Sequence, residues 1–405
     1  IRRPPRSTLS SSSAASDVYK RQAYNNANLL PRDPIVIFFF IKKSFLTCIG
    51  IVQLLKTICM NKKPLILGIE TSCDETAASL ISENEQGIPI ILSNIISSQT
   101  EVHKEFGGVV PELAARSHLE KIDWIVQKAL DESGKKIDEI DAVAATAGPG
   151  LVVCLSVGLS FGKTFANLIK KPFIAVNHLE GHALSPRINS ELNYPYLFLL
   201  ISGGHSQFLN VKGLGNYKRL GTTIDDAVGE AFDKTAKLLG LKYPGGPEIE
   251  KMSVRGKNMK DRLPRPILNS NDYNFSFSGL KTAVLYKVNE LKREGELSNQ
   301  LISNICLEFQ NAAIDCLLHK TNKALIDFDL KQVVLSGGVA ANKELRRRFS
   351  TDLHQGCSAI YPDFSHCTDN GTMIAFTGYE KINLPKEDNK ISVNPKWSLE
   401  EVDNG

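Results

Sequence analysis

The 405-residue sequence has no closely spaced pair of cysteines. Two of its eight cysteines precede residue 60, and the other six lie far apart at Cys73, Cys154, Cys306, Cys316, Cys357 and Cys367. A disulfide framework or a structural zinc knuckle needs cysteines at short, regular spacings. The pattern therefore excludes both and predicts the reduced thiols of a cytosolic protein.

A strong charge of either sign is also missing. The formal net charge is +4, but residues 1–59 hold nine Lys or Arg and two Asp or Glu, which leaves 39 basic and 42 acidic residues in the remainder. That remainder therefore has a net charge of −3, so any contact with nucleic acid has to rest on local basic patches. With 42% hydrophobic and 23% charged residues, the composition is that of a soluble globular protein of two or more domains.

Residues 1–59 lack methionine, and the first one is Met60. Three interpretations of this leader are upstream or cloning sequence, an organellar transit peptide and a membrane anchor. We expect the first, with no ordered structure, because an initiator is missing and the composition changes abruptly. Lys42 and Lys43 interrupt the apolar stretch at residues 35–55, which argues against a membrane span. A cytoplasmic location is expected, or a mitochondrial one if the leader is a genuine transit peptide.

Strand-like and helical patterns alternate after residue 60. Strands are expected at residues 65–69, 80–81, 142–146, 173–176, 196–201, 207–211, 332–335 and 359–361. One helix is expected to begin at Pro111, and another to end at about Ile169. A strand, a polar turn and a second strand occur at residues 65–81 and again at 196–211, which suggests an internal duplication. The sequence thus predicts an α/β protein of two similar lobes with a ligand cleft between them.

The expected boundaries follow from this duplication. Residues 60–172 form the N-terminal lobe and residues 173–383 the C-terminal lobe, which carries the metal and nucleotide site. The last helix of the second lobe is expected to return to the first lobe, and residues 384–405 form a tail.

His178 and His182 directly follow the apolar run Phe173–Val176. On a helix, a spacing of four residues places both imidazoles on one face, where they can hold a single metal ion. Asp369 is the best candidate for a third ligand, because its segment is polar, contains glycine and opens a helix. Two histidines and a carboxylate suit one divalent ion per subunit, with Fe(II) favoured over Zn(II).

Two Ser-Gly-Gly turns, Ser202–His205 and Ser336–Val339, each follow a hydrophobic run. Consecutive backbone N–H groups without obstructing side chains can bind a phosphate, above all near a helix N-terminus. The second turn lies where a nucleotide usually meets an α/β sheet, because a helix begins near Asn342. Asn342 either hydrogen-bonds the nucleotide or caps that helix.

Carboxylates and basic residues are the remaining candidates for functional residues. Asp74 and Glu75 lie at the tip of the first hairpin, and Asp233 lies downstream; each is able to act as a base or to bind hydroxyl groups. The basic stretches are Arg255, Lys257, Lys260, Arg262 and Arg265, and Arg346–Arg348. They either contact an RNA backbone or form ordinary solvated surface.

Seven motifs together resemble the tRNA N6-adenosine threonylcarbamoyltransferase family, of the bacterial type, once described as O-sialoglycoprotein endopeptidases or glycoproteases. They are Gly68–Thr76, Phe106–Glu112, His178–His182, Ser202–His205, Asp225–Lys234, Tyr243–Pro247 and Ser336–Asn342. The similarity extends from about Met60 to about Ile382. It implies the two-lobed actin-like and Hsp70-like (ASKHA) fold, and a metal held by His178, His182 and Asp369.

The resemblance also implies a substrate pocket and a reaction. The pocket is made by Leu200, Ile201, Ser202, Gly203, Gly204, Asp233, Gly246 and Asn342. Members pass a threonylcarbamoyl group from threonylcarbamoyl-AMP to the N6 amine of adenosine 37, beside the anticodon, in tRNAs that read codons beginning with A. Asp74 or Glu75 is expected to orient or deprotonate that amine, with Arg255, Lys257, Lys260 and Arg262 as candidate tRNA contacts.

The expected partners are tRNA, threonylcarbamoyl-AMP, an inactive paralogue and a small ATPase. Two other functions compete with this one. A metalloprotease is disfavoured because Glu180 is two residues from each histidine, on another helix face. A sugar kinase or ATPase of the same fold is disfavoured because such enzymes use carboxylates and Mg²⁺ rather than a histidine-held ion.

Overall fold

The computed structural model describes residues 63–402, except for residues 107, 189, 191, 363–366 and 385–390. The predicted leader lies outside the described residues, as does Gly107 of the Phe106–Glu112 motif. The chain divides into two compact units, Ile1–Lys63 and Pro64–Gly405. The description that follows concerns the second unit.

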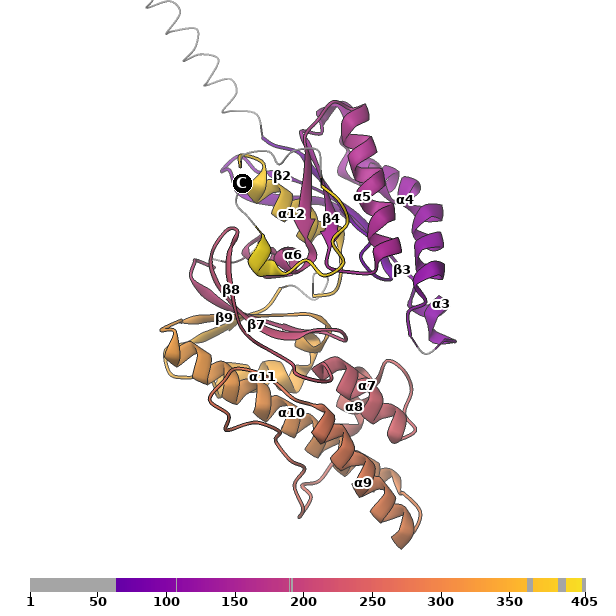
Figure 1. Ribbon diagram of the computed structural model, residues 1–405, viewed down its shortest axis with the longest axis vertical. Coiled ribbons are helices and arrows are strands. Elements are labelled where there is room, and N and C mark those ends of the chain that lie inside the picture. Colours follow the sequence, from indigo (N-terminus) through magenta and orange to yellow (C-terminus); the bar gives the residue numbers. More distant parts are fainter. Residues whose placement is uncertain are drawn as a thin grey trace, which may run out of the picture. The chain divides into compact units, whose positions relative to one another are not determined.

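Two five-stranded sheets of the same topology form this unit (Figure 1). The first has the order β3-β2-β1-β4-β5 and the second the order β8-β7-β6-β9-β10. In each sheet the first three strands along the chain form antiparallel pairs. The fourth strand pairs in parallel with the first, and the fifth pairs in parallel with the fourth. The first sheet comprises β1 Ile66–Glu70, β2 Glu75–Glu83, β3 Pro89–Ser98, β4 Ala142–Gly148 and β5 Phe173–Asn177. The second comprises β6 Tyr196–Ile201, β7 Ser206–Gly213, β8 Asn216–Thr222, β9 Gln332–Ser336 and β10 Ser358–Ile360. The duplication predicted from the two hairpins is therefore confirmed.

Helices cover both faces of the first sheet. The helices α4 (Pro111–Ser133) and α5 (Val152–Leu168) pack on one face, and α12 (Gly371–Lys381) packs on the other (Figure 1). Strand alternation decides which residue meets which helix. Leu67 and Ile69 face the core under α4 and α5, whereas Ile66 faces α12. Pro111 occupies the first position of α4, as predicted, and Gly134 ends the helix with a φ of 65°.

The second sheet has its largest core on the side of α7 (Val228–Leu238), α8 (Gly245–Ser253), α9 (Ser278–Glu294), α10 (Asn299–Asp327) and α11 (Lys343–Thr351). Its other face packs against α6 (His178–Leu184) and the short helix η6 (Leu399–Glu401). Helix α10 is long and apolar enough to cross a membrane by length and composition alone. However, 67% of its apolar window is buried inside the protein, which is typical of a core helix.

The remaining helices are short: α3 (Thr100–Lys104), η2 (Ile137–Glu139), η3 (Ser185–Ile188) and η4 (Gly338–Ala341). Of these, η4 directly follows the turn after β9 and leads into α11. It therefore positions the second Ser-Gly-Gly turn.

The predicted boundary between the lobes, at residue 173, lies one strand too early. Strand β5 pairs in parallel with β4, from Val143 opposite Phe173 onward, and so completes the first sheet. An apolar run has the same pattern in either sheet, which is why the sequence does not show this pairing. Residues 391–402 of the predicted tail are also part of the fold, since Trp397 packs near β4 and Val402 packs under the second sheet.

Close packing of α12 on the first sheet depends on glycine. A Cβ at Gly68 of β1 would lie 2.2 Å from the backbone nitrogen of Ala375, and one at Gly371 would lie 2.6 Å from the carbonyl carbon of Ala78. Backbone atoms cannot move aside as side chains can. The helix therefore approaches the sheet only because neither residue has a side chain.

We expect Gly68→Ala to lower the free energy of unfolding by about 1–3 kcal/mol or more, because the added methyl forces α12 away from β1. Urea-induced unfolding measures this change. Gly213→Ala in β7 is the matched control, since a Cβ there meets nothing within 4 Å. Equal stability of the two variants would contradict the packing argument.

Candidate functional site

Helix α6 is seven residues long, and every one of its residues is buried. The Asn177 side chain caps it and accepts hydrogen bonds from the backbone nitrogens of Leu179 and Glu180. The helix contacts β4, β5 and α12 of the first lobe and also β6 and β9 of the second (Figure 1). It therefore carries its side chains to the junction of the two lobes.

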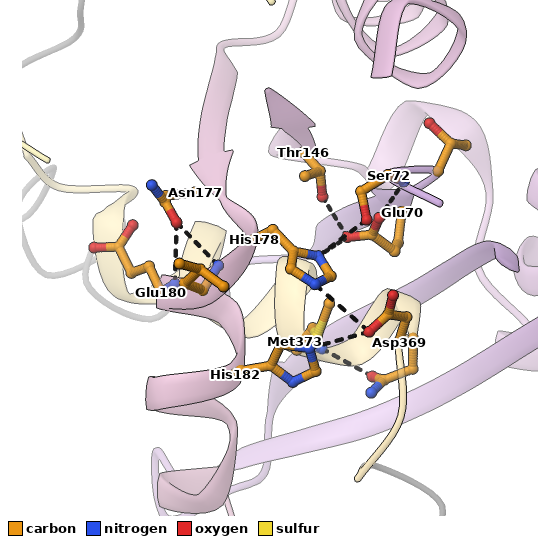
Figure 2. A network of polar contacts seen from close by, with 12 residues as sticks. Glu70, Ser72, Thr146, Asn177, His178, Glu180, His182, Asp369 and Met373 are labelled. Atoms are coloured by element: carbon orange, nitrogen blue, oxygen red, sulfur yellow. Dashed lines mark hydrogen bonds and ion pairs between the residues drawn. The ribbon is translucent and has the colours of Figure 1, made fainter. Parts of the chain in front are cut away.

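His178 and His182 project from one face of α6 toward Asp369 (Figure 2). The Nε2 atoms of His178 and His182 lie 3.5 Å and 3.0 Å from Asp369 Oδ1. One ligand atom from each residue falls within 4.8 Å of the other two. Asp369 precedes α12, whose N-terminus is capped by Asn370. Two imidazole nitrogens and one carboxylate oxygen form a donor set that fits a divalent transition metal.

The other imidazole nitrogens are also engaged. His178 Nδ1 lies 3.2 Å from Glu70 Oε2, and His182 Nδ1 lies 3.4 Å from Ser336 Oγ. Glu70 is itself held by the backbone N–H of Ser72 and by the hydroxyl of Thr146 (Figure 2). A carboxylate that accepts the Nδ1 proton leaves the His178 Nε2 lone pair free for a metal. The hydrogen bonds of His178 and Glu70 therefore also favour metal binding by His178, His182 and Asp369.

Several carboxylates lie close to His178 and perturb the pKa values of the site. Burial alone would lower the pKa of His178, but the charges of Asp369 and Glu70 outweigh it and raise this pKa to about 9. Burial, together with the charges of Asp369 and Asp74, raises the pKa of Glu75 to about 9. Burial and the charges of His178 and His182 lower the pKa of His205 to about 4. Such mutual perturbation is typical of a functional site, and a bound cation would relieve the repulsion between the carboxylates.

Two adjoining cavities, each of about 380 Å³, meet at Gly203, Gly338 and Thr368. The first contains the His178, His182 and Asp369 triad, and its predicted neighbours Asp74, Glu75, Leu200, Ser202, Gly203 and Gly204 also line it. The second is more apolar, and Gly203, Asp233, Gly246 and Asn342 line it. The structure thus brings the predicted metal and substrate residues together around a continuous cleft.

Ile201 is the exception among the predicted pocket residues. It lines neither cavity, and its side chain is fully buried in the core on the helical side of the second sheet. Leu200 faces the opposite side, because successive side chains of a strand alternate.

Asn342 caps α11, which was one of its two predicted roles. Its Oδ1 accepts from the backbone nitrogen of Leu345 at 2.9 Å, and its Nδ2 donates to Gln310 Oε1 at 2.9 Å. Asp233 accepts from the backbone nitrogen of Gly245 at 2.7 Å, and burial raises its pKa. Both side chains are therefore fixed in place where they face the second cavity.

Glu180 points away from the two imidazoles (Figure 2). It is fully buried, accepts a hydrogen bond from the Tyr217 hydroxyl at 2.8 Å, and pairs with Lys381 Nζ at 2.8 Å. A carboxylate used in this way does not reach a water between the histidines. The geometry therefore argues against the metalloprotease alternative.

The four candidate RNA contacts, Arg255, Lys257, Lys260 and Arg262, are exposed and form no ion pair within the described part of the chain. The neighbouring Arg265 is instead paired with Glu308 and Asp315. In the second basic stretch, Arg347 and Arg348 also pair with acidic residues. Only the first stretch thus presents uncompensated charge.

Sequence reasoning missed Glu70 and His205 as site residues. Glu70 ends the otherwise apolar strand β1, and a carboxylate at that position is a usable signal. His205 belongs to a turn that was singled out for its glycines, so its imidazole received no role. It lines the first cavity together with His178, His182 and Asp369.

Comparisons with known proteins identify the family of this chain. A model of the tRNA N6-adenosine threonylcarbamoyltransferase family matches residues 90–376. A tRNA N6-adenosine threonylcarbamoyltransferase of Pelagibacter ubique is 59% identical over 350 residues, which cover 84% of this chain and 96% of the relative. One from Brucella suis is 49% identical over 345 residues, covering 83% and 95%. The chain belongs to the tRNA N6-adenosine threonylcarbamoyltransferase family.

Membership makes this chain a transferase that modifies tRNA, which confirms the resemblance found in the sequence. Among solved structures, full-length HypF in a phosphate- and nucleotide-bound form is similar with a TM-score of 0.52 and 15% identity, over 80% of this chain and 56% of that chain. HypF of T. kodakarensis gives 0.51 and 14%, over 79% and 47%. These likenesses concern the fold alone. Together with the duplicated sheets, they confirm the predicted two-lobed ASKHA fold.

We expect Glu70→Gln to weaken metal binding about 10–100-fold, because His178 loses the carboxylate that orients its ring. Metal titration against a competing chelator measures the affinity, with circular dichroism to verify the fold. Glu132→Gln, on the exposed side of α4, is the matched control. Unchanged affinity in Glu70→Gln would refute this role.

We expect Lys381→Met to lower the free energy of unfolding by about 3–5 kcal/mol, because it leaves the buried Glu180 charge without a countercharge, with only the Tyr217 hydroxyl to solvate it. Urea-induced unfolding is the measurement. Lys331→Met is the control, since Lys331 and its partner Asp329 are 69% and 88% exposed, and we expect a change below about 0.5 kcal/mol. The double variant Glu180→Gln with Lys381→Met should recover part of the loss; equal losses in Lys381→Met and the control would contradict the pairing.

Proposed function

We propose that this chain transfers the threonylcarbamoyl group from threonylcarbamoyl-AMP to the N6 amine of adenosine 37 in tRNAs that read codons beginning with A. One observation carries the proposal: a triad of His178, His182 and Asp369 that could hold a metal ion and two glycine-rich turns line the same two adjoining cavities. The family named by the comparisons supports the reaction class.

The cleft offers a place for each part of the donor. The more apolar cavity, with Phe232 and Val339 in its lining, suits the adenosine moiety, and Asp233 is placed to accept from its hydroxyl groups. Gly203 and Gly338 belong to both cavities, so the phosphate is expected between the two turns, beside their backbone N–H groups. The threonylcarbamoyl group then extends toward His178, His182 and Asp369.

These three residues would hold the metal, and we propose Fe(II) in preference to Zn(II). When bound, a divalent ion supplies positive charge that stabilises negative charge on a phosphate or carbonyl oxygen. The glycine N–H groups serve the same purpose for the AMP leaving group. In the transfer a bond forms from N6 to the carbamoyl carbon, the bond from that carbon to the phosphate oxygen breaks, and N6 loses one proton.

Asp74 is the proposed acceptor of this proton. Asp74 and Glu75 both line the metal-facing cavity, but the raised pKa of Glu75, about 9, favours its protonated form at neutral pH. A protonated carboxyl donates a hydrogen bond and does not act as a base. The assignment therefore goes to Asp74.

We further propose that the chain works in the cytoplasm with the inactive paralogue and the small ATPase of the bacterial threonylcarbamoyl complex. The bacterial relatives at 59% and 49% identity support this setting.

We expect the full chain, threonylcarbamoyl-AMP and these two partners to convert unmodified tRNA to the threonylcarbamoyladenosine form, as measured by nucleoside mass spectrometry. Asp74→Asn should lower kcat by at least about 100-fold because the amine loses its base. Glu75→Gln is the matched control and should lose less, because it keeps a hydrogen-bond donor. Product from Asp74→Asn at the parent rate would refute this role of Asp74, and absence of product from the parent with all components would refute the proposed function.

A further inference from the structure

A groove of about 660 Å³ lies in the second lobe, apart from the cleft, between residues 261–264 and α9. Its lining includes the aromatic side chain of Tyr286, which is 70% exposed, and the cations Arg262, Lys287 and Arg293. None of the residues assigned to the cleft lines this groove.

The exposed face of α9 is built by helical spacing. Leu280, Val284 and Val288 are buried in the core of the lobe, so the opposite face is presented to solvent. Tyr286 and Arg293 are seven residues apart, two turns of the helix, and both are exposed. The ring and the guanidinium therefore lie along the same side of α9.

The segment facing α9 is held rigidly at both ends. The backbone nitrogen of Lys257 donates to Asn304 Oδ1 at 2.8 Å, and that of Leu263 donates to Glu308 Oε1 at 3.1 Å. Arg265 is anchored to Glu308 by a contact of 2.6 Å. Because the backbone is fixed at these points, the exposed side chain of Arg262 is presented at a defined position opposite α9.

The charge that the groove presents is positive. The lining holds three cations (Arg262, Lys287 and Arg293) and two carboxylates, a net charge of +1, and Lys287 lies between the carboxylates, 3.2 Å from Asp261 and 3.0 Å from Glu290. Arg262 and Arg293 are exposed and have no ion pair among the described residues. An exposed ring flanked by uncompensated arginines is the arrangement that binds single-stranded nucleic acid by stacking and phosphate contacts.

The groove is also connected to the cleft through the chain. Gly246 and Pro247, at the start of α8, line the apolar cavity. The helix of nine residues spans about 13 Å. The exposed residues Arg255, Lys257 and Lys260 follow it and lead to Arg262 in the groove. Exposed basic residues thus occur along the chain from the end of α8 to the groove.

We propose that this groove is an RNA-binding surface for the tRNA substrate. An unpaired base stacks on Tyr286, and Arg262 and Arg293 contact the phosphates on either side of it. The proposal rests on the proposed function, because it assigns the groove to the tRNA whose adenosine enters the cleft. The one aromatic ring of the lining lies beside cations, and the other apolar residues there, Leu263, Pro264 and Ala283, are not aromatic, which favours RNA over a protein partner.

Binding of fluorescently labelled, unmodified tRNA to the full chain tests this proposal by anisotropy over a series of salt concentrations. We expect Tyr286→Ala to raise the Kd about 5–150-fold, the loss that corresponds to removal of one stacked base. Tyr286→Phe should stay within about twofold of the parent, since the ring is kept. Arg262→Gln and Arg293→Gln should each weaken binding and lower the salt dependence by about 0.7. Lys331→Gln, at another exposed position, is the control and should change neither quantity.

A second readout separates this proposal from the proposed function. In the modification assay, Tyr286→Ala should raise the KM for tRNA and leave kcat unchanged. If the parent does not modify tRNA but its RNA affinity still depends on Tyr286, the proposed function fails and the groove stands. If the parent modifies tRNA, and Tyr286→Ala leaves both the Kd and the KM unchanged, the groove proposal is overturned. It is equally overturned if Tyr286→Ala weakens association with the paralogue while RNA binding is unaffected.

Discussion

The arrangement of the cleft depends on one short helix that is buried on all sides. Within α6, His178, Glu180 and His182 are polar and buried, and burying such groups without partners would cost several kcal/mol. Their partners come from several elements: Glu70 from β1, Tyr217 from β8, Ser336 from β9 and Lys381 from the end of α12, with Ser72 just after β1 and Asp369 just before α12. The polar contacts of α6 therefore join both lobes. The same contacts that satisfy the helix also aim its two imidazoles into the cleft.

The duplicated sheets place equivalent hairpin turns at this junction, but the turns have different chemistry. The turn between β1 and β2 carries Asp74 and leads to Glu75, whereas the turn between β6 and β7 carries Gly203 and Gly204. Both turns line the cavity that contains His178, His182 and Asp369. One lobe thus offers carboxylates that attract a cation or a proton, and the other offers unobstructed backbone N–H groups that suit an anion. This asymmetry gives a symmetric scaffold a direction for group transfer.

The sequence predicted what local patterns determine. Strands such as Tyr196–Ile201 were found because they are wholly buried and therefore continuously apolar, and His178 and His182 were paired because helix geometry fixes their spacing. It did not reveal contacts between distant segments. Glu70 lies 108 positions from His178, and no local pattern encodes that contact. The same limitation misplaced the lobe boundary, because an apolar run does not specify which sheet a strand joins.

For a protein that modifies tRNA, the net charge of the whole chain is a poor guide to where the RNA binds. The chain after residue 59 has a net charge of −3, which taken alone disfavours a polyanionic partner. At physiological ionic strength, however, exposed charges are screened beyond about 8 Å, so a phosphate responds to its neighbours and not to the total. Around His178, acidic side chains are concentrated in a buried cleft, whereas Arg293 on α9 and Arg262 on the segment that faces it are exposed. If the two proposals hold, the negative charge serves to hold a cation and the positive charge to retain the RNA backbone. Affinity and chemistry can then be tuned by separate residues, because the two charged regions are built on different elements.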